Sequence, residues 1–163
     1  MSARLVAVVL LGLLGCSRPA PPPPKPVVVE VYTDLVCPWC FIGTERLDRA
    51  IAASGLGERV QLRHRPFLLN PDTPAGGLDV AQHLREKTGR EPRELFARVE
   101  AVARESGLEL DLSRQRRMPS TVLAHVLLAA APPGKQRALE QAFFRAHFQE
   151  ARDLGDPAVL TAL

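Results

Sequence analysis

The chain has 163 residues, of which 46% are hydrophobic and 24% charged, with a formal net charge of +3. This balance fits a soluble globular protein with one ordinary domain, and it excludes a disordered acidic chain, a coiled coil and a polytopic membrane protein. The basic residues are scattered along the sequence, so no nucleic-acid partner is expected. Three cysteines are an odd number and cannot all pair within one chain.

The first fifteen residues have the pattern of an export signal. Arg4 is followed by an apolar run over residues 5–14 and then by Gly15 and Cys16. As a helix, ten residues would cross about half of a bilayer core, which is too short for a transmembrane anchor. A basic start and a short apolar stretch predict a secretory signal peptide over residues 1–15.

Residues 13–16, Leu-Leu-Gly-Cys, resemble the lipobox of bacterial lipoproteins. The resemblance implies cleavage before Cys16 and acylation of that residue, which would anchor the protein to a membrane. The alternative is an ordinary signal peptide in which Cys16 is incidental. Residues 16–26 then form a proline-rich linker, expected to be an extended polyproline II spacer. We therefore expect a lipid-anchored protein on the periplasmic side of the bacterial cell envelope, an oxidising compartment.

The folded part is predicted to begin with a βαβ unit. Residues 27–33 are nearly all β-branched or aromatic and predict a buried strand. Residues 37–53 have helical spacing, with Phe41 and Leu47 on one face, and residues 60–68 alternate as a strand does. Two strands joined by a helix are expected to pair in parallel.

The rest of the chain is predicted to be helical. Helices are expected over residues 78–88, 92–106, 119–131 and 135–152, followed by a short helix from Asp156. The third is almost wholly apolar and is expected to be buried, and the last is expected to expose Val159, Leu160 and Leu163. The predicted fold is α/β: one domain over residues 27–163, with a βαβ start and a helical insertion at about 78–152.

The strongest chemical signal is Cys37-Pro38-Trp39-Cys40, where the first strand leads into the first helix. A cysteine at a helix start meets unpaired backbone N–H groups and the positive end of the helix dipole, which favour the thiolate. The second cysteine, one turn later, is close enough to form a disulfide with the first. The spacing predicts an attacking thiol at Cys37 and a resolving thiol at Cys40, with no metal or other cofactor.

Two other interpretations of this motif stay open. It could be half of a zinc site, which would need two more ligands, but Cys16 lies far upstream and the four histidines have no ligand-like spacing. It could be a structural disulfide, although so small a loop would stabilise the fold little. Each histidine taken alone is expected to be a core or surface residue.

The sequence around the motif, from Val-Glu-Val-Tyr-Thr-Asp34 to Phe-Ile-Gly43, resembles the opening of the DsbA-like thioredoxin superfamily, specifically its FrnE-like branch. The agreement returns at residues 65–71, 74–78, 84–89, 120–125 and 144–150. The resemblance implies a thioredoxin-like fold and thiol–disulfide oxidoreductase activity, with Cys37 as nucleophile and Cys40 as resolving thiol. Related isomerases and kappa-class glutathione transferases usually have serine in place of the first cysteine, which is intact here.

The resemblance also implies partners and tuning positions. The partners would be protein thiols and disulfides and an unidentified redox-recycling protein. Asp34, Pro38 and Trp39 are the candidates for tuning the cysteines. Trp39 replaces the histidine of DsbA itself, and because an indole carries no charge, we expect Cys37 to be less acidic than in DsbA.

Two further departures from the family pattern bear on activity. Val31 stands where the wider superfamily often buries an acid. The family also continues with a Gly-Val-Pro-type loop bearing a cis-proline, two strands and a helix, so this chain is expected to lack the C-terminal β-hairpin and last helix. The alternative function is therefore a non-catalytic remnant or binding module, or a metal-binding module that uses the two cysteines.

Overall fold

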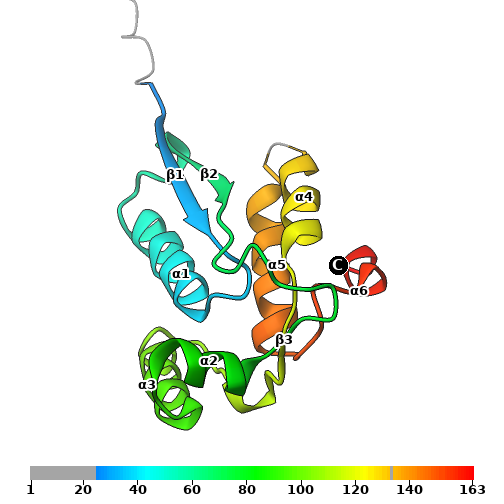
Figure 1. Cartoon of the computed structure of the whole chain (residues 1–163). Helices are drawn as coiled ribbons and strands as arrows, with labels where there is room; N and C mark the ends of the chain where they lie inside the picture. The colour runs from blue at the N-terminus through cyan, green and yellow to red at the C-terminus, as the bar shows by residue number, and fades with distance from the viewer. Residues whose placement is uncertain (1–24, 133) are drawn as a thin grey trace, which may run out of the picture.

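The structure is a computed structural model that describes residues 25–132 and 134–163 (Figure 1). The predicted signal peptide, Cys16 and nearly all of the proline-rich linker lie outside the described residues, so those assignments stay predictions. Within the described residues, no helix combines the length and the apolar character needed to cross a membrane.

The chain starts with the predicted βαβ unit. Strand β1 (Val27–Thr33) leads into helix α1 (Pro38–Ala53), and a short 3-10 turn η1 (Gly57–Arg59) precedes strand β2 (Val60–Pro66). The two strands pair in parallel, in a register that runs from Val27 opposite Val60 to Thr33 opposite Pro66. Parallel pairing of strands joined by a helix is therefore confirmed, and it brings the ends of β1 and β2 together beside the first turn of α1.

The expectation that β1 is buried is wrong for most of its length. Val27, Val28 and Tyr32 are exposed, and Thr33 is its one fully buried residue. The reason is that β1 pairs only with β2 among the described residues, so no second strand covers its free edge. The alternation predicted for β2 is confirmed, because Val60, Leu62 and His64 are half-buried while their neighbours along the strand are exposed.

The helical insertion begins with a short strand that the sequence did not predict. Strand β3 (Leu78–Asp79) pairs antiparallel with β4 (Arg117–Met118), and each is too short to show a two-residue period. Gly77 enters this pair with φ +74°, and a Cβ atom there would lie 2.9 Å from the carbonyl oxygen of Met118. Only glycine fits such a left-handed close approach without strain.

Between these strands lie the two helices predicted for this region. Helix α2 (Val80–Thr88) starts two residues later than expected and ends at Gly89, whose φ of +67° is left-handed. Helix α3 (Pro92–Glu105) follows, and the 3-10 turn η2 (Leu112–Arg114) leads back towards β4. Figure 1 shows α2 and α3 packed together below α1, at the end of the sheet where the cysteine motif lies.

The last three helices are α4 (Val122–Ala130), α5 (Gln136–Phe148) and α6 (Pro157–Thr161). Helix α4 was expected to be buried, but it packs on one side only, against α5 and β2. Its outer side chains are exposed. They are Val122, Leu123, Val126 and Leu127. In α6 the expectation that Leu160 is exposed is wrong, because Leu160 is buried.

The core lies between α1 and α5 and is built around stacked phenylalanines. The ring of Phe41 lies 5.1 Å from that of Phe144 and 6.0 Å from that of Phe148, with nearly parallel planes. All three are buried, and Phe41 directly follows Cys40 in α1. The aromatic stack therefore fixes the first turn of α1, and with it the cysteine motif, against α5.

Candidate active site

Cys37 is the N-cap residue of α1, and Cys40 lies in the first turn of that helix. The backbone N–H of Cys40 donates to the Sγ of Cys37 at 3.3 Å and to its carbonyl oxygen at 3.0 Å. Both cysteines are half-buried and present as free thiols. Pro38 occupies the first helical position, where a missing N–H costs nothing. The local sequence thus places one sulfur directly over the open N–H groups of the helix.

The two thiols have opposite acidities. The pKa of Cys37 is lowered to about 7, chiefly because the Cys40 thiol donates a hydrogen bond to it, with help from the backbone N–H groups of Cys40 and Trp39. Burial and the negative charge of Asp34 act against this lowering. Donating that hydrogen bond, together with burial, raises the pKa of Cys40 far above that of an ordinary cysteine. Cys37 is therefore the thiol that ionises near neutral pH, while Cys40 keeps its proton.

The other predicted tuning residues lie around this pair in different ways. Trp39 is 45% exposed and presents an indole beside Cys37 at the surface. Asp34 is buried, and its backbone oxygen accepts the N–H of Cys37 at 3.0 Å. Its carboxylate points away from that contact, accepting the N–H of Leu69 at 2.7 Å and the hydroxyl of Thr121 at 2.8 Å. Asp34 thus ties the loop before the motif to the loop after β2 and to the start of α4.

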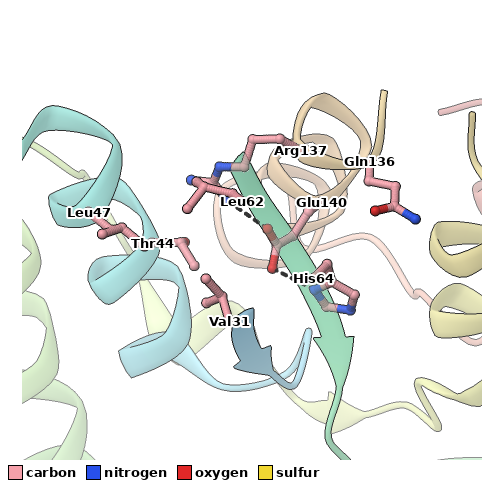
Figure 2. A pocket seen from close by; sticks show the side chains of 8 residues that line it. All are labelled: Val31, Thr44, Leu47, Leu62, His64, Gln136, Arg137 and Glu140. Atoms are coloured by element: carbon pink, nitrogen blue, oxygen red, sulfur yellow. Dashed lines mark hydrogen bonds and ion pairs between the residues drawn. The ribbon is translucent and has the colours of Figure 1, made fainter. Parts of the chain in front are cut away.

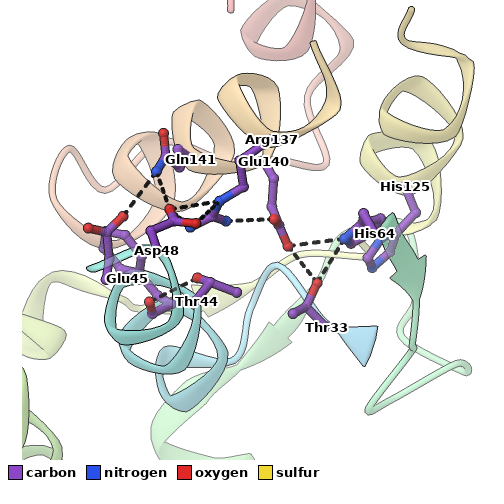
Figure 3. Close-up of polar contacts among 10 residues, drawn as sticks. Thr33, Thr44, Glu45, Asp48, His64, His125, Arg137, Glu140 and Gln141 are labelled. Carbon is purple, nitrogen blue, oxygen red and sulfur yellow. Dashed lines mark hydrogen bonds and ion pairs between the residues drawn. The ribbon is translucent and has the colours of Figure 1, made fainter. Parts of the chain in front are cut away.

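Sequence reasoning missed a buried polar network behind the motif (Figure 3). Glu140 of α5 accepts hydrogen bonds from Thr33 at 2.8 Å and contacts His64 at 3.0 Å. Its other oxygen pairs with Arg137, which also forms an ion pair with Asp48 of α1. The sequence indicated only that His64 points inward in the alternating strand, because its partners Thr33, His125 and Glu140 lie 31, 61 and 76 residues away in the sequence.

A small cavity adjoins this network (Figure 2). It has a volume of about 20 Å³, enough for one water molecule, and its wall includes Val31, His64 and Glu140. Val31 stands at the position where the wider superfamily often buries an acid. In the structure, a buried carboxylate from α5, that of Glu140, lines the same cavity as the Val31 side chain.

A much larger open cavity of about 450 Å³ lies on the other side of the motif, between α1 and the pair α2–α3. Cys37, Pro38 and Trp39 form part of its wall, and the rest is mostly apolar. The apolar side chains are Val36, Leu69, Val80, Leu84, Leu95, Phe96, Val99, Leu112, Met118 and Phe148. The charged side chains in its wall are Lys87 and Arg98, and no carboxylate lines it. Among the described residues, no three His, Cys, Asp or Glu side chains are placed to hold a metal ion.

Comparison with known proteins agrees with this geometry. The model of the family described as DSBA-like thioredoxin domain matches residues 28–163. Among solved structures, a probable DsbA oxidoreductase from Streptomyces coelicolor superposes with a TM-score of 0.73 at 32% identity, over 83% of this chain and 60% of that one. The resemblance to the DsbA-like thioredoxin superfamily and the thioredoxin-like α/β fold class, both predicted from the sequence, are thereby confirmed.

Two further relatives are more distant. An uncharacterised protein of Bacillus subtilis, YwbO, is 29% identical over 141 residues, which are 84% of this chain and 64% of the relative. A 2-hydroxychromene-2-carboxylate isomerase has a TM-score of 0.51 at 14% identity, over 83% of this chain and 64% of the isomerase, and shares the fold alone. The chain thus spans about three fifths of the length of the relatives that it matches.

Proposed function

The chain belongs to the DSBA-like thioredoxin domain family, and on that premise we propose that it is a thiol–disulfide oxidoreductase acting on protein thiols through Cys37 and Cys40. The observation that carries the proposal is the asymmetry of the two thiols. One is held as a thiolate near neutral pH at the start of α1, and its neighbour keeps its proton. The probable DsbA oxidoreductase among the structural relatives supports the same chemistry.

The reaction would run in two exchanges. The Cys37 thiolate attacks one sulfur of a substrate disulfide, forming a mixed disulfide and releasing the other substrate sulfur as a thiolate. Cys40 then gives up its proton and attacks the Cys37 sulfur, which releases the second substrate sulfur. The substrate gains two electrons and the Cys37–Cys40 pair loses two. The reverse sequence oxidises a substrate dithiol.

The large cavity beside Cys37 supports binding of a substrate next to the reactive sulfur. Its wall is mostly apolar and is contiguous with the exposed Trp39. A peptide segment that carries a cysteine can place a neighbouring apolar side chain in this cavity while its sulfur meets Cys37. We propose that protein segments of this kind are the substrates, with a separate redox protein restoring the starting state.

Selective alkylation tests the assignment of the nucleophile. At pH 7 we expect Cys37 of the reduced protein to react at least about tenfold faster than Cys40, because only the thiolate is nucleophilic. The Cys37 rate should be half-maximal near pH 7 and fall as the pH decreases. Peptide mass spectrometry after timed treatment with iodoacetamide measures both rates.

The Cys40→Ala variant is the matched control for this measurement. It removes the thiol hydrogen bond that contributes most to the low pKa of Cys37, so the half-maximal pH of Cys37 alkylation should move upwards. Equal and slow alkylation of both cysteines in the unaltered protein, with the pH dependence of an ordinary thiol, would contradict the proposed function.

We also propose that the protein works in the cell envelope, anchored by a lipid on Cys16. The support is the apolar run before Leu-Leu-Gly-Cys16 and the proline-rich spacer after it. Full-length protein expressed in a bacterium should sediment with membranes, and Cys16→Ala should release it or block its maturation. Recovery of the unaltered protein in the soluble envelope fraction, without a lipid, would show that the signal is an ordinary one.

A further inference from the structure

Two histidines lie in line between two buried carboxylates behind the cysteine motif. Going from α5 towards the motif, Glu140 Oε1 lies 3.0 Å from His64 Nδ1, and His64 Nε2 lies 3.3 Å from His125 Nδ1. His125 Nε2 lies 3.6 Å from Asp34 Oδ1. The side chains are 2–5% exposed, so these contacts are shielded from bulk solvent.

The line contains three gaps, each between two polar atoms: Glu140 to His64, His64 to His125, and His125 to Asp34. The two atoms across a gap attract each other only if one of them carries a proton. Two neutral imidazoles carry only two N–H groups. With two protons, one gap stays without a proton: either a bare nitrogen faces a carboxylate oxygen, or the bare nitrogens of His64 and His125 face each other. Among the described residues, His125 Nε2 is the buried side-chain atom without a hydrogen bond, and 3.6 Å is too long for a good one. A third proton on the histidine pair satisfies all three gaps.

Thr33 does not supply the missing proton. Its hydroxyl donates to Glu140 Oε1 at 2.8 Å and lies 3.0 Å from His64 Nδ1. If the hydroxyl turned to His64 instead, Glu140 and the bare nitrogen would face each other at 3.0 Å with no proton between them. The contacts of Thr33 therefore leave the requirement for a third imidazole proton unchanged.

Both carboxylates at the ends of the line stay ionised. Burial raises the pKa of the Asp34 carboxyl, but its contacts with His125, the Leu69 N–H and the Thr121 hydroxyl outweigh burial and lower it. The pKa of Glu140 is also lowered despite burial. Hydrogen bonds from His64 and Thr33 and the charge of Arg137 are the causes of that lowering. The extra proton therefore belongs to the imidazoles.

The line ends at Asp34, whose backbone oxygen accepts the N–H of Cys37. The negative charge of Asp34 raises the pKa of both Cys37 and Cys40, so a positive charge on the far side of Asp34 counteracts this effect. His147 of α5 also feels the charge of Asp34, but burial keeps it neutral by lowering its pKa to about 4. At the opposite end, the Arg137–Asp48 ion pair lies behind Glu140.

We propose that His64 and His125 share one extra proton between Glu140 and Asp34, and that this buried cation offsets the charge of Asp34 and so favours the Cys37 thiolate. The effect of this cation on the redox reaction rests on the proposed function, because a more stable Cys37 thiolate favours the dithiol form over the Cys37–Cys40 disulfide. His64 and His125 are positioning residues in this scheme, because they act on the sulfurs through Asp34.

A double-mutant cycle on the full chain tests the coupling. In His125→Gln the Asp34 charge loses its counterion, so Cys37 alkylation at pH 6 should slow about three- to tenfold and the reduction potential should become more negative. Asp34→Asn should speed alkylation. In Asp34→Asn, adding His125→Gln should change the rate less than about twofold, because the charge to be offset is gone. Arg65→Gln, which removes an exposed charge from β2, is the control and should change nothing.

Nuclear magnetic resonance of the unaltered protein supplies a readout that needs no variant. With ¹⁵N-labelled histidine, His64 and His125 should show three protonated ring nitrogens between them at neutral pH. Two protonated nitrogens would overturn the proposal, as would an equal effect of His125→Gln with and without Asp34→Asn. Neither measurement depends on exchange activity, so the two proposals can fail separately. A protein whose histidine pair is charged but whose Cys37 does not catalyse exchange would contradict the proposed function and leave this inference standing.

Discussion

Replacing Cys37 by alanine should reduce catalysed thiol–disulfide exchange by about a thousandfold or more, to the uncatalysed rate. The expectation follows from the acidities of the pair, because Cys37 has a pKa near 7 and Cys40 keeps its proton. With Cys37 absent, the remaining thiol lies half-buried within the first turn of α1, where burial still raises its pKa, and it lacks the position at the helix start from which Cys37 attacks. The rate at which dithiothreitol reduces a small protein disulfide, measured with the unaltered protein, with Cys37→Ala and with neither, gives this loss.

Cys40→Ala should fail in a different way. Cys37 still attacks the substrate, but no second thiol releases it, so a mixed disulfide between Cys37 and the substrate should accumulate. This product is visible as a higher-mass band that disappears on reduction. Cys16→Ala, assayed as purified protein so that membrane anchoring has no effect, is the control for loss of a cysteine as such and should keep the full exchange rate. Exchange that survives in Cys37→Ala would show that the motif does not carry the reaction.

The local features of the site could be predicted from the sequence, but the cause of the low Cys37 pKa could not. The change from a β-branched run to helical spacing at Cys37 predicts a sulfur at a helix start, which is where the structure places it. The helix terminus was expected to account for the acidity of Cys37. In the structure the hydrogen bond from the Cys40 thiol contributes more, and its geometry depends on side-chain packing.

The contacts between residues far apart in the sequence could not be predicted from sequence patterns. The contact of His64 with Glu140 joins β2 to α5 across 76 residues, and the contact with His125 crosses 61. A periodic pattern shows which face of an element is inward, but it does not show which inward side chains meet. The same limit explains α4, whose apolar sequence predicts burial all round although one side only finds partners.

The largest effect on stability is expected from Phe144→Ala. Phe144 is fully buried and stacks on Phe41 and Phe148, so truncation removes the central ring and leaves a cavity between α1 and α5. Replacing a buried phenylalanine by alanine typically costs about 3–5 kcal/mol. That is a large share of the about 5–15 kcal/mol by which a domain of this kind is stable.

Urea denaturation of the full chain measures this change as a lower midpoint with an unchanged slope. Phe67→Ala is the matched control, because the same side chain is 52% exposed there and its loss should change the free energy of unfolding by less than about 0.5 kcal/mol. Since Phe41 directly follows Cys40, Phe144→Ala should also loosen the first turn of α1 and raise the pH of half-maximal Cys37 alkylation. A variant with unaltered stability would show that α5 does not hold the cysteine motif in place.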